Sequence, residues 1–312
     1  MSAENIPLPL VLEASEELTD LQNRRKAVAA FTAESVLAAH ERSAVYAGLY
    51  DGQPAILKLF RGPNFKKKAR RQKQEMERLA TFMSTGRYRT PELLDAWVNL
   101  GITVTTRIEG KTLAQALIRA SLGERDHLIA EAGHWLSRLA GPTLFRDTFA
   151  GKFWLSRKRN DLPRIQYPPD MVLARALLAR LEALIPDVRG HSVTKAEIHG
   201  DFSPPNLILT ETALYGVDIQ SVAPQPLVRD IARFLLYLHI VIPQRDSGLK
   251  FGVSERDIDV MLGTVALPEN ERQTLLPFFI GLEMVDKLAR LRPDHVRAAA
   301  LRGAINRYLE TV

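Results

Sequence analysis

The stretch "EIHGDFSPPNLIL", from Glu197 to Leu209, decides how this chain folds. Apolar residues flank a polar centre in which a His-Gly-Asp triplet ends at Asp201 and two adjacent prolines precede Asn206. Proline fixes the backbone φ angle, so this loop holds Asp201 and Asn206 at a restricted separation. We expect the apolar flanks to anchor the loop in a core, while the polar side chains face a site.

The residues after this loop predict a β-hairpin that ends on a second carboxylate. "LILTETALYGVDI", from Leu207 to Ile219, has two short apolar runs around a polar turn. A hairpin of this length returns its end close to its beginning, so Asp218 is expected beside Asn206 and Asp201. Amide and carboxylate oxygens of this kind hold Mg²⁺ when substrate phosphates and water complete the coordination. The pattern therefore predicts a magnesium site for phosphoryl transfer.

The bulk composition is that of an ordinary globular protein and excludes several classes of chemistry. The chain has 312 residues, of which 46% are hydrophobic and 25% charged, and it contains no cysteine. Disulfides, thiolate catalysis and cysteine-based zinc sites are therefore excluded. The apolar stretches are too short to span a membrane, and the N-terminal residues make a poor signal peptide. We expect a cytoplasmic protein without a transmembrane segment.

The formal net charge of +6 arises partly from one basic run, Arg61–Lys73, which holds seven basic residues. This run is either the solvated face of a helix or a patch for phosphate, nucleic acid or an anionic lipid head group. Only Phe65 interrupts it with an aromatic ring, which argues against single-stranded nucleic acid. No DNA partner is expected, although the helix around residues 66–73 could contact an anionic partner.

The remaining pattern predicts an α+β protein with two domains. Residues 43–60 read as two strands around an Asp-Gly turn, residues 66–83 as a helix, and residues 97–108 as two more strands. We therefore expect an N-terminal domain at residues 1–107, with a helical lead before its sheet, and a mainly helical C-terminal domain at residues 108–312. The helices of the second domain are expected at about 111–120, 124–140, 170–185, 226–241, 254–263, 268–290 and 293–310.

"HGDFSPPN" followed by "GVDIQ" resembles the catalytic and metal-binding motifs of the aminoglycoside phosphotransferase family. This family contains small-molecule kinases, among them choline, homoserine and fructosamine kinases. "AILKLF" resembles its third N-lobe strand, "TTRIEG" its interlobe hinge, and "PLVRDIARFLLYL" the helix that follows its metal-binding Asp. The resemblance implies a two-lobed, protein-kinase-like fold. Its small N-lobe has an antiparallel sheet and one helix, and its larger helical C-lobe carries a catalytic β-hairpin.

The resemblance assigns roles in the catalytic loop and after it. Asp201 would accept or orient the proton of the attacking hydroxyl, and Asn206 and Asp218 would bind Mg²⁺ on the nucleotide phosphates. His199 would be a structural loop residue. Asp230 would brace the loop or cap its own helix.

The resemblance also implies an ATP site built by the N-lobe. Lys58 would contact the α- and β-phosphates and would be held by Glu75. Backbone groups of Thr106 and Ile108 would bond the adenine edge. No glycine-rich G-x-G-x-x-G loop is present, so Ser43 and neighbouring amides would cover the phosphates.

Alternatives remain open for the N-lobe residues. Lys58 on an edge strand could point to solvent, and an inward Lys needs a carboxylate partner. Glu75 competes with Glu77, but only Glu75 shares a helical face with Leu79 and Phe82.

We therefore expect an ATP- and Mg²⁺-dependent kinase that phosphorylates a hydroxyl of a small molecule. The positive charge argues against a polycationic aminoglycoside and leaves a sugar, an amino alcohol or an anionic glycolipid precursor as acceptors. One alternative is a catalytically inactive kinase-fold protein that binds nucleotide or an anionic partner. A weaker one is a nucleic-acid-associated protein that acts through the basic helix.

Overall fold

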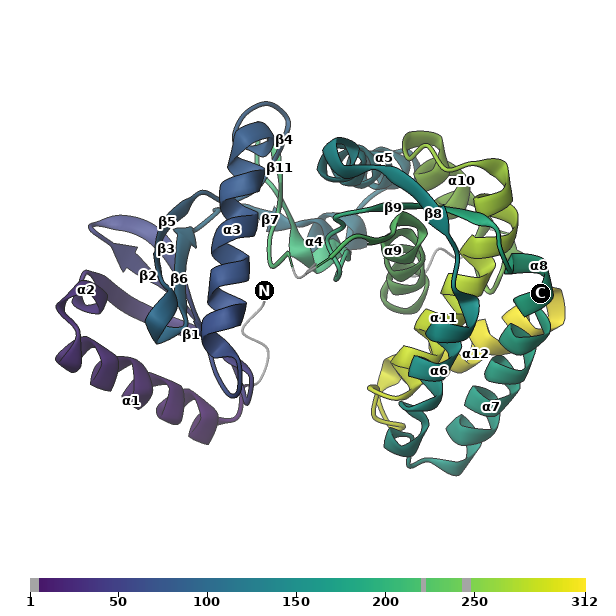
Figure 1. The fold of residues 1–312 in the computed structure, drawn as a ribbon, viewed down its shortest axis with the longest axis horizontal. Coiled ribbons are helices and arrows are strands. Elements are labelled where there is room, and N and C mark those ends of the chain that lie inside the picture. The colour runs from purple at the N-terminus through teal and green to yellow at the C-terminus, as the bar shows by residue number, and fades with distance from the viewer. Residues whose placement is uncertain (1–5, 220–222, 243–247) are drawn as a thin grey trace. The chain divides into compact units, whose positions relative to one another are not determined.

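The chain divides into two compact units (Figure 1). Unit 1 comprises Met1–Thr112 and Ile208–Val217, and unit 2 comprises Leu113–Leu207 and Asp218–Val312. The computed structural model describes residues 6–219, 223–242 and 248–312. The boundary expected after residue 107 stays a prediction.

Unit 1 is built on a five-stranded antiparallel sheet with strand order β1-β2-β3-β6-β5. One face of the sheet packs on the first helix, because alternate residues such as Leu57 and Leu59 join Ala14 and Leu18 of that helix in one buried cluster. The elements of this part are α1 (Leu8–Arg24), α2 (Lys26–Ala29), β1 (Phe31–His40), β2 (Ser43–Tyr50), β3 (Gln53–Phe60), α3 (Phe65–Met83), β5 (Leu93–Trp97), the short helix η1 (Val98–Leu100) and β6 (Ile102–Thr106).

The predicted strands of unit 1 are present, and one further strand joins them. β2 and β3 pair as a hairpin across Asp51 and Gly52, as the Asp-Gly signal predicts. The sequence analysis did not predict β1. Its pairing with β2 contains two register irregularities, which disrupt the alternation of apolar and polar residues that identifies a strand.

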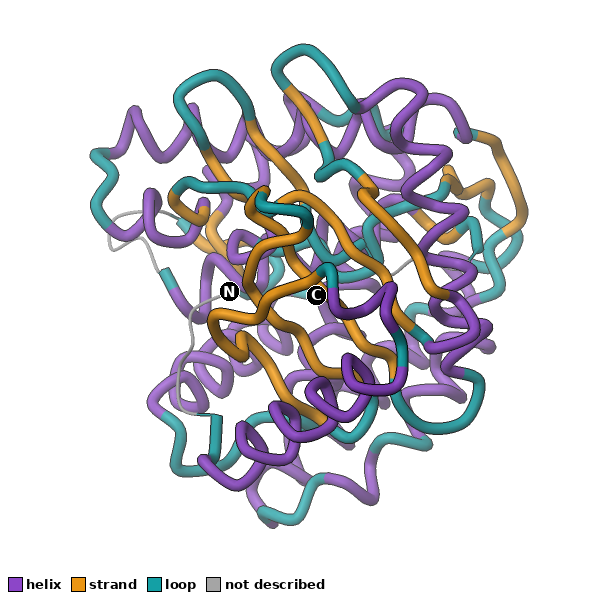
Figure 2. Tube along the Cα trace, turned by 90° about the vertical axis from the view of Figure 1, so that its left-hand side faces the viewer, coloured by secondary structure: helices purple, strands orange, loops and turns teal. Residues whose placement is uncertain are grey.

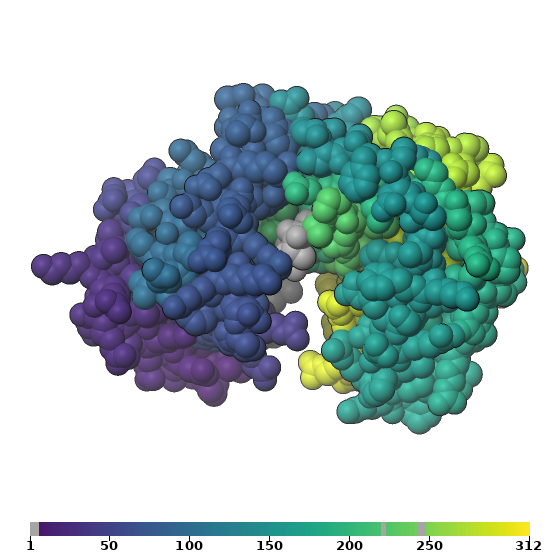
Figure 3. Space-filling model, viewed as in Figure 1, coloured from purple at the N-terminus to yellow at the C-terminus, as the bar shows by residue number. Residues whose placement is uncertain are grey.

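Helix α3 contacts β3, β5 and β6 through its apolar stripe. Met76, Leu79 and Met83 are buried on this stripe. The opposite face of α3 contains much of the predicted basic run and is exposed on the molecular surface. Figure 3 shows this part of the chain in blue. The exposed basic residues at the start of the helix are Lys66, Lys67, Arg70 and Arg71.

A second, four-stranded sheet in unit 1 contains the predicted hairpin that follows the quoted loop. Its strand order is β4-β11-β10-β7, with β11 parallel to β4 and β10 antiparallel to β7. These strands are β4 (Tyr88–Arg89), β7 (Lys111–Thr112), β10 (Leu207–Leu209) and β11 (Leu214–Gly216).

Unit 2 is mainly helical and also contains short strands; Figure 2 distinguishes the helices, in purple, from the strands, in orange. Helix α11 lies at its centre: it contacts α6, α7, α9 and α12, and nearly all its residues are buried. The helices are α4 (Leu113–Ile118), α5 (Leu122–Ala140), α6 (Gly151–Arg159), α7 (Pro168–Ala183), α8 (Ile185–Val188), α9 (Leu227–Val241), α10 (Glu255–Thr264), α11 (Leu276–Leu288) and α12 (Val296–Thr311). The short helical turns are η2 (Gly141–Thr143), η3 (Leu162–Arg164), η4 (Pro204–Asn206) and η5 (Glu271–Leu275). The strands are β8 (Phe145–Thr148), β9 (Ser192–Ala196), β12 (Gln225–Pro226), β13 (Leu249–Lys250) and β14 (Val253–Ser254).

All helical regions expected in the C-terminal part contain helices, so the predicted α+β class and two-lobed fold are confirmed. The sequence analysis did not predict α6, β8 or β9. In the part of the chain that the structure describes, no helix is both long enough and apolar enough for a membrane crossing.

Candidate active site

The loop around Asp201 is anchored in the core of unit 2 by its apolar neighbours. Ile198 and Phe202 are completely buried, and Phe202 stacks between Trp135 and Phe234. The following residues form the short helical turn η4, in which the amide of Asn206 donates to the carbonyl of Ser203 at 2.9 Å. The loop backbone is therefore fixed from both sides of Asp201.

The carboxylate of Asp201 is held at both oxygens and still reaches solvent. A guanidinium nitrogen of Arg233 donates to Oδ1 at 2.9 Å, and Nδ2 of Asn206 donates to Oδ2 at 3.2 Å. The Asp201 side chain is 41% exposed. Its oxygens are thus oriented by the protein and accessible to an acceptor hydroxyl, which is the geometry that a proton acceptor requires.

Arg233 connects the catalytic loop to helix α11. It donates to the carbonyl of Gly200 at 2.7 Å and pairs with both carboxylate oxygens of Glu283, at 2.9 and 3.2 Å. Burial lowers the pKa of the Arg233 guanidinium, but the neighbouring Glu283 and Asp201 carboxylates raise it by a larger amount. The net shift of the pKa is therefore upward. Arg233 therefore carries its charge at every physiological pH.

Two residues expected to be structural support the same loop. The Asp230 carboxylate is buried and accepts a hydrogen bond from the amide of Gly200 at 3.1 Å, as the bracing role predicts. Burial raises the pKa of this carboxyl. His199 is buried against Trp135 and Phe202, and its Nδ1 accepts from the amide of Asp201 at 3.3 Å.

Asn206 and Asp218 stand at the two ends of the hairpin. β10 and β11 are neighbours in their sheet, and the Thr210 amide donates to the Ala213 carbonyl across the turn at 2.9 Å. The hairpin begins directly after Asn206 and reverses the chain direction. Asp218, which follows its second strand, therefore lies at the end of the hairpin where Asn206 precedes the first strand. Asp218 adopts the left-handed conformation, with φ of 58°, which is uncommon for a residue other than glycine.

The donor set at this end of the hairpin fits a magnesium ion. Nδ2 of Asn206 donates to the carbonyl of Asp201 at 2.9 Å and to its carboxylate. This fixes the amide orientation, and Oδ1 of Asn206 accepts no hydrogen bond from any described residue. An amide oxygen and a carboxylate are hard ligands of the kind that Mg²⁺ prefers.

Lys58 and Glu75 lie on β3 and α3 of unit 1. Lys58 pairs with Val45 on one side and with Thr103 on the other, so its strand is not an edge strand. Its side chain points to the face of the sheet opposite Leu57 and Leu59. Glu75 is half-buried and forms a two-pronged ion pair with Arg78, at 2.7 and 3.0 Å. The ion pair between Lys58 and Glu75 stays a prediction.

The segment predicted to bind adenine begins at the end of β6. Thr106 donates its amide to the carbonyl of Glu92 and pairs with Ala55. The amide of Ile108 donates to no described residue and is therefore available to a ligand. Ser43 begins β2 and pairs with Phe60.

The sequence analysis missed Arg233, Glu283 and the residues of α6. Arg233 follows Asp230 by three positions within the apolar run "DIARFLLYL". A charged side chain in such a run is rarely buried without a partner. This signal could have indicated Arg233, but not its partner Glu283, which lies on a different helix.

The ion pairs of the buried Asp286 carboxylate predict a dependence of stability on pH. Burial raises the pKa of the Asp286 carboxyl, but Lys158 at 2.5 Å and Arg290 at 3.0 Å lower it by more. A lowered pKa stabilises the fold above the unfolded value of about 3.9, and this stability is lost as the pH falls further. Asp286→Asn should therefore cost about 1.5–3 kcal/mol near neutral pH and progressively less below about pH 4.

Urea unfolding of the wild type and Asp286→Asn across this pH range measures the difference. Asp20→Asn is the control, because the exposed Asp20–Arg24 ion pair should contribute little. A difference that stays constant with pH would contradict the role of the Asp286 charge.

A comparison with models of known protein families identifies the family of this chain. The sequence model of the phosphotransferase enzyme family matches residues 34–250, more than half of the chain. No curated protein has a sequence that matches this chain.

Several solved structures share the fold at low sequence identity. A choline/ethanolamine kinase family protein from Mesorhizobium loti is 17% identical, with a TM-score of 0.58 over 94% of this chain and 93% of that chain. An aminoglycoside phosphotransferase in complex with ADP and hygromycin B is 12% identical, with a TM-score of 0.62 over 95% and 98%. A glucosamine kinase is 16% identical, with a TM-score of 0.59 over 95% and 84%.

The family match confirms the resemblance carried by the motifs around Asp201 and Asp218, and the structural likeness confirms the kinase-like fold. This chain belongs to the phosphotransferase enzyme family, whose model matches residues 34–250.

Proposed function

We propose that the protein transfers the γ-phosphate of ATP, with Mg²⁺, to a hydroxyl of a small molecule. The observation that carries this proposal is the Asp201 carboxylate, which Arg233 and Asn206 orient while it stays accessible. In the reaction the acceptor oxygen bonds to the γ-phosphorus, and the bond to the β-phosphate oxygen breaks. ADP leaves, and the acceptor proton passes to Asp201 and then to solvent.

The residues of unit 2 perform the acceptor and metal steps. Asp201 orients the acceptor hydroxyl and takes its proton as the new bond forms. Oδ1 of Asn206 and the carboxylate of Asp218 would hold a magnesium ion. When bound, Mg²⁺ neutralises the charge of the nucleotide phosphates.

The residues of unit 1 bind the nucleotide. The ammonium of Lys58 contacts the α- and β-phosphates. Glu75 positions this ammonium, either by leaving its ion pair with Arg78 or by contacting both cations. The Ile108 amide and the Thr106 backbone bond the adenine edge, and Ser43 covers the phosphates. The exposed basic side chains of α3 remain a proposed contact for an anionic partner.

ADP release from Mg-ATP in the presence of a panel of hydroxylated metabolites tests this function. We expect turnover that requires both magnesium and one class of acceptor. Titration with Mg-ATP should also raise the melting temperature, because a ligand bound only by the native state stabilises it. A melting shift without turnover on any acceptor would favour the inactive kinase-fold alternative. The absence of any shift at millimolar Mg-ATP would contradict the nucleotide site itself.

A further inference from the structure

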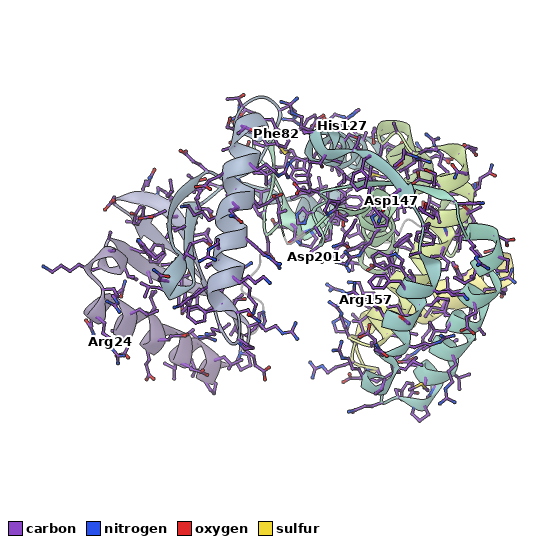
Figure 4. All side chains as sticks on the ribbon, in the orientation of Figure 1. Arg24, Phe82, His127, Asp147, Arg157 and Asp201 are labelled. Carbon is purple, nitrogen blue, oxygen red and sulfur yellow. The ribbon has the colours of Figure 1, made fainter. Side chains whose placement is uncertain are left out.

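A group of cations on the helices of unit 2 is linked to Asp201 through contacts that run by way of Trp154, Glu283 and Arg233. It has no role in the steps described so far. Arg157 on α6, Arg229 on α9 and Lys287 on α11 form this group, which we call the cation cluster. Figure 4 shows Arg157 and Asp201 along the same margin of unit 2. An acceptor whose hydroxyl approaches Asp201 would present the rest of its structure to such neighbouring side chains, so their charge bears on its identity.

Trp154 joins the two arginines of the cluster. The guanidinium of Arg157 lies 5.9 Å from its ring centre and that of Arg229 lies 5.8 Å from it. The same ring packs edge-on against Phe279, at 5.1 Å between centroids. Trp154 is only partly buried, so part of its ring also remains available to a ligand.

Helix α11 extends the cluster toward Asp201. Phe279, Glu283 and Lys287 follow each other at intervals of four residues and therefore share one face of α11. Glu283 is the residue that holds Arg233 against Asp201. Lys287 is close enough to Glu283 and Asp201 for both to affect its pKa.

Two cations of the cluster have no bonded carboxylate, and the third has only one long ion pair. The side chains of Lys287 and Arg157 form no hydrogen bond or ion pair with any residue that the structure describes. Arg229 donates to the side-chain oxygen of Gln225, and its closest carboxylate, Glu283, is 3.9 Å away. Burial lowers the pKa of Lys287, and Glu283, Asp201 and Asp286 offset only part of this effect, so the cation is partly desolvated.

The carboxylates of the same region are already occupied. Arg233 binds both oxygens of Glu283, while Lys158 and Arg290 bind Asp286. An ammonium group on an acceptor would therefore find no carboxylate here without a cation. An anionic group would find three cations, and two of them flank an aromatic ring.

We propose that the acceptor is an anion: a small hydroxylated molecule with a carboxylate or phosphate bound by Arg229, Lys287 and Arg157, and its carbon skeleton against Trp154. This inference rests on the proposed function of Asp201. Arg229 and Arg233 are one turn apart on α9, about 6 Å along the axis, and Arg233 contacts Asp201. The anion-binding guanidinium of Arg229 therefore belongs to the same helix as the guanidinium that orients Asp201.

A charge-matched acceptor panel tests the proposal. Glycerol, glycerate, glycerol phosphate and aminopropanol form one series, and glucose, gluconate, glucose phosphate and glucosamine form another. We expect kcat/KM to be about 10-fold or more higher for an anionic member than for its neutral and cationic counterparts. Equal or better turnover of neutral or cationic members would overturn the inference and leave the proposed function intact.

Variants separate a binding role of the cluster from a structural one. Arg229→Gln and Lys287→Met should each raise KM for the anionic acceptor about 10-fold or more, with an unchanged melting shift on adding Mg-ATP. Lys287→Met should also raise the melting temperature of the free protein, because it removes a partly desolvated cation. A lower melting temperature with unchanged KM would show that Lys287 is only structural. The matched control is Arg307→Gln, an exposed residue of α12 paired with Glu310.

Direct titration decides the anion site if no member of the panel is turned over. The absence of turnover for every acceptor in the panel would count against the proposed function. Glycerol phosphate, glycerate and gluconate would then be titrated in the presence of Mg²⁺ and a non-hydrolysable ATP analogue. Binding by any of them that Arg229→Gln abolishes would support the anion site, and the absence of binding by all three would overturn it.

Discussion

Asp201→Asn is expected to slow phosphotransfer by about 10²–10⁴-fold, because the amide cannot accept the proton of the acceptor hydroxyl. The substitution should leave the loop intact. The new side-chain oxygen can still accept from Arg233, which binds Oδ1 at 2.9 Å in the wild type. The effect should therefore fall on kcat, as measured by ADP release at saturating acceptor.

Nucleotide binding distinguishes this effect from misfolding. The variant should show the same melting shift with Mg-ATP as the wild type. Asp20→Asn, which alters an exposed ion pair of α1, should keep full activity. If Asp201→Asn retained more than about a tenth of the wild-type rate, Asp201 would not be the proton acceptor.

Arg233→Met should destabilise the protein by about 3–5 kcal/mol, because it leaves the buried Glu283 carboxylate without its guanidinium. It should also lower kcat, since the same guanidinium holds Oδ1 of Asp201 and the carbonyl of Gly200. Urea unfolding measures the first effect and ADP release measures the second.

The double variant Arg233→Met with Glu283→Leu separates the two roles. Replacing a buried ion pair by apolar residues is often neutral, so stability should return to within about 1 kcal/mol of the wild type. The rate should stay low, because nothing replaces the Arg233 contact with Asp201. Recovery of both stability and rate would show that Arg233 does not position the catalytic carboxylate.

The loop and hairpin were predictable because their information is local. Two prolines restrict the path from Asp201 to Asn206, and a polar turn between short apolar runs returns the chain at Asp218. The Asp-Gly turn between β2 and β3 belongs to the same class of signal. The roles of these residues came from resemblance to a family, and the assays above are what test them.

Local signals failed where pairing was irregular or distant. β1 was missed because two register irregularities disrupt its alternation of apolar and polar residues. Lys58 was correctly placed on a strand, and its ion pair with Glu75 stays a prediction, while Glu75 pairs with Arg78 on its own helix.

Residue types, their order and their short-range spacing were sufficient to predict the kinase-like fold and the hairpin between Asn206 and Asp218. Only the tertiary structure shows that Arg233 contacts both Asp201 and Glu283. Glu283 follows Arg233 by 50 residues in the sequence. The tertiary structure alone placed Trp154 of α6 against Arg229 and Phe279. Spacing along one helix or hairpin determines which neighbours meet, because backbone geometry is regular over a few residues. Contacts between helices depend on how complete side-chain surfaces pack together, and no short stretch of sequence contains that information.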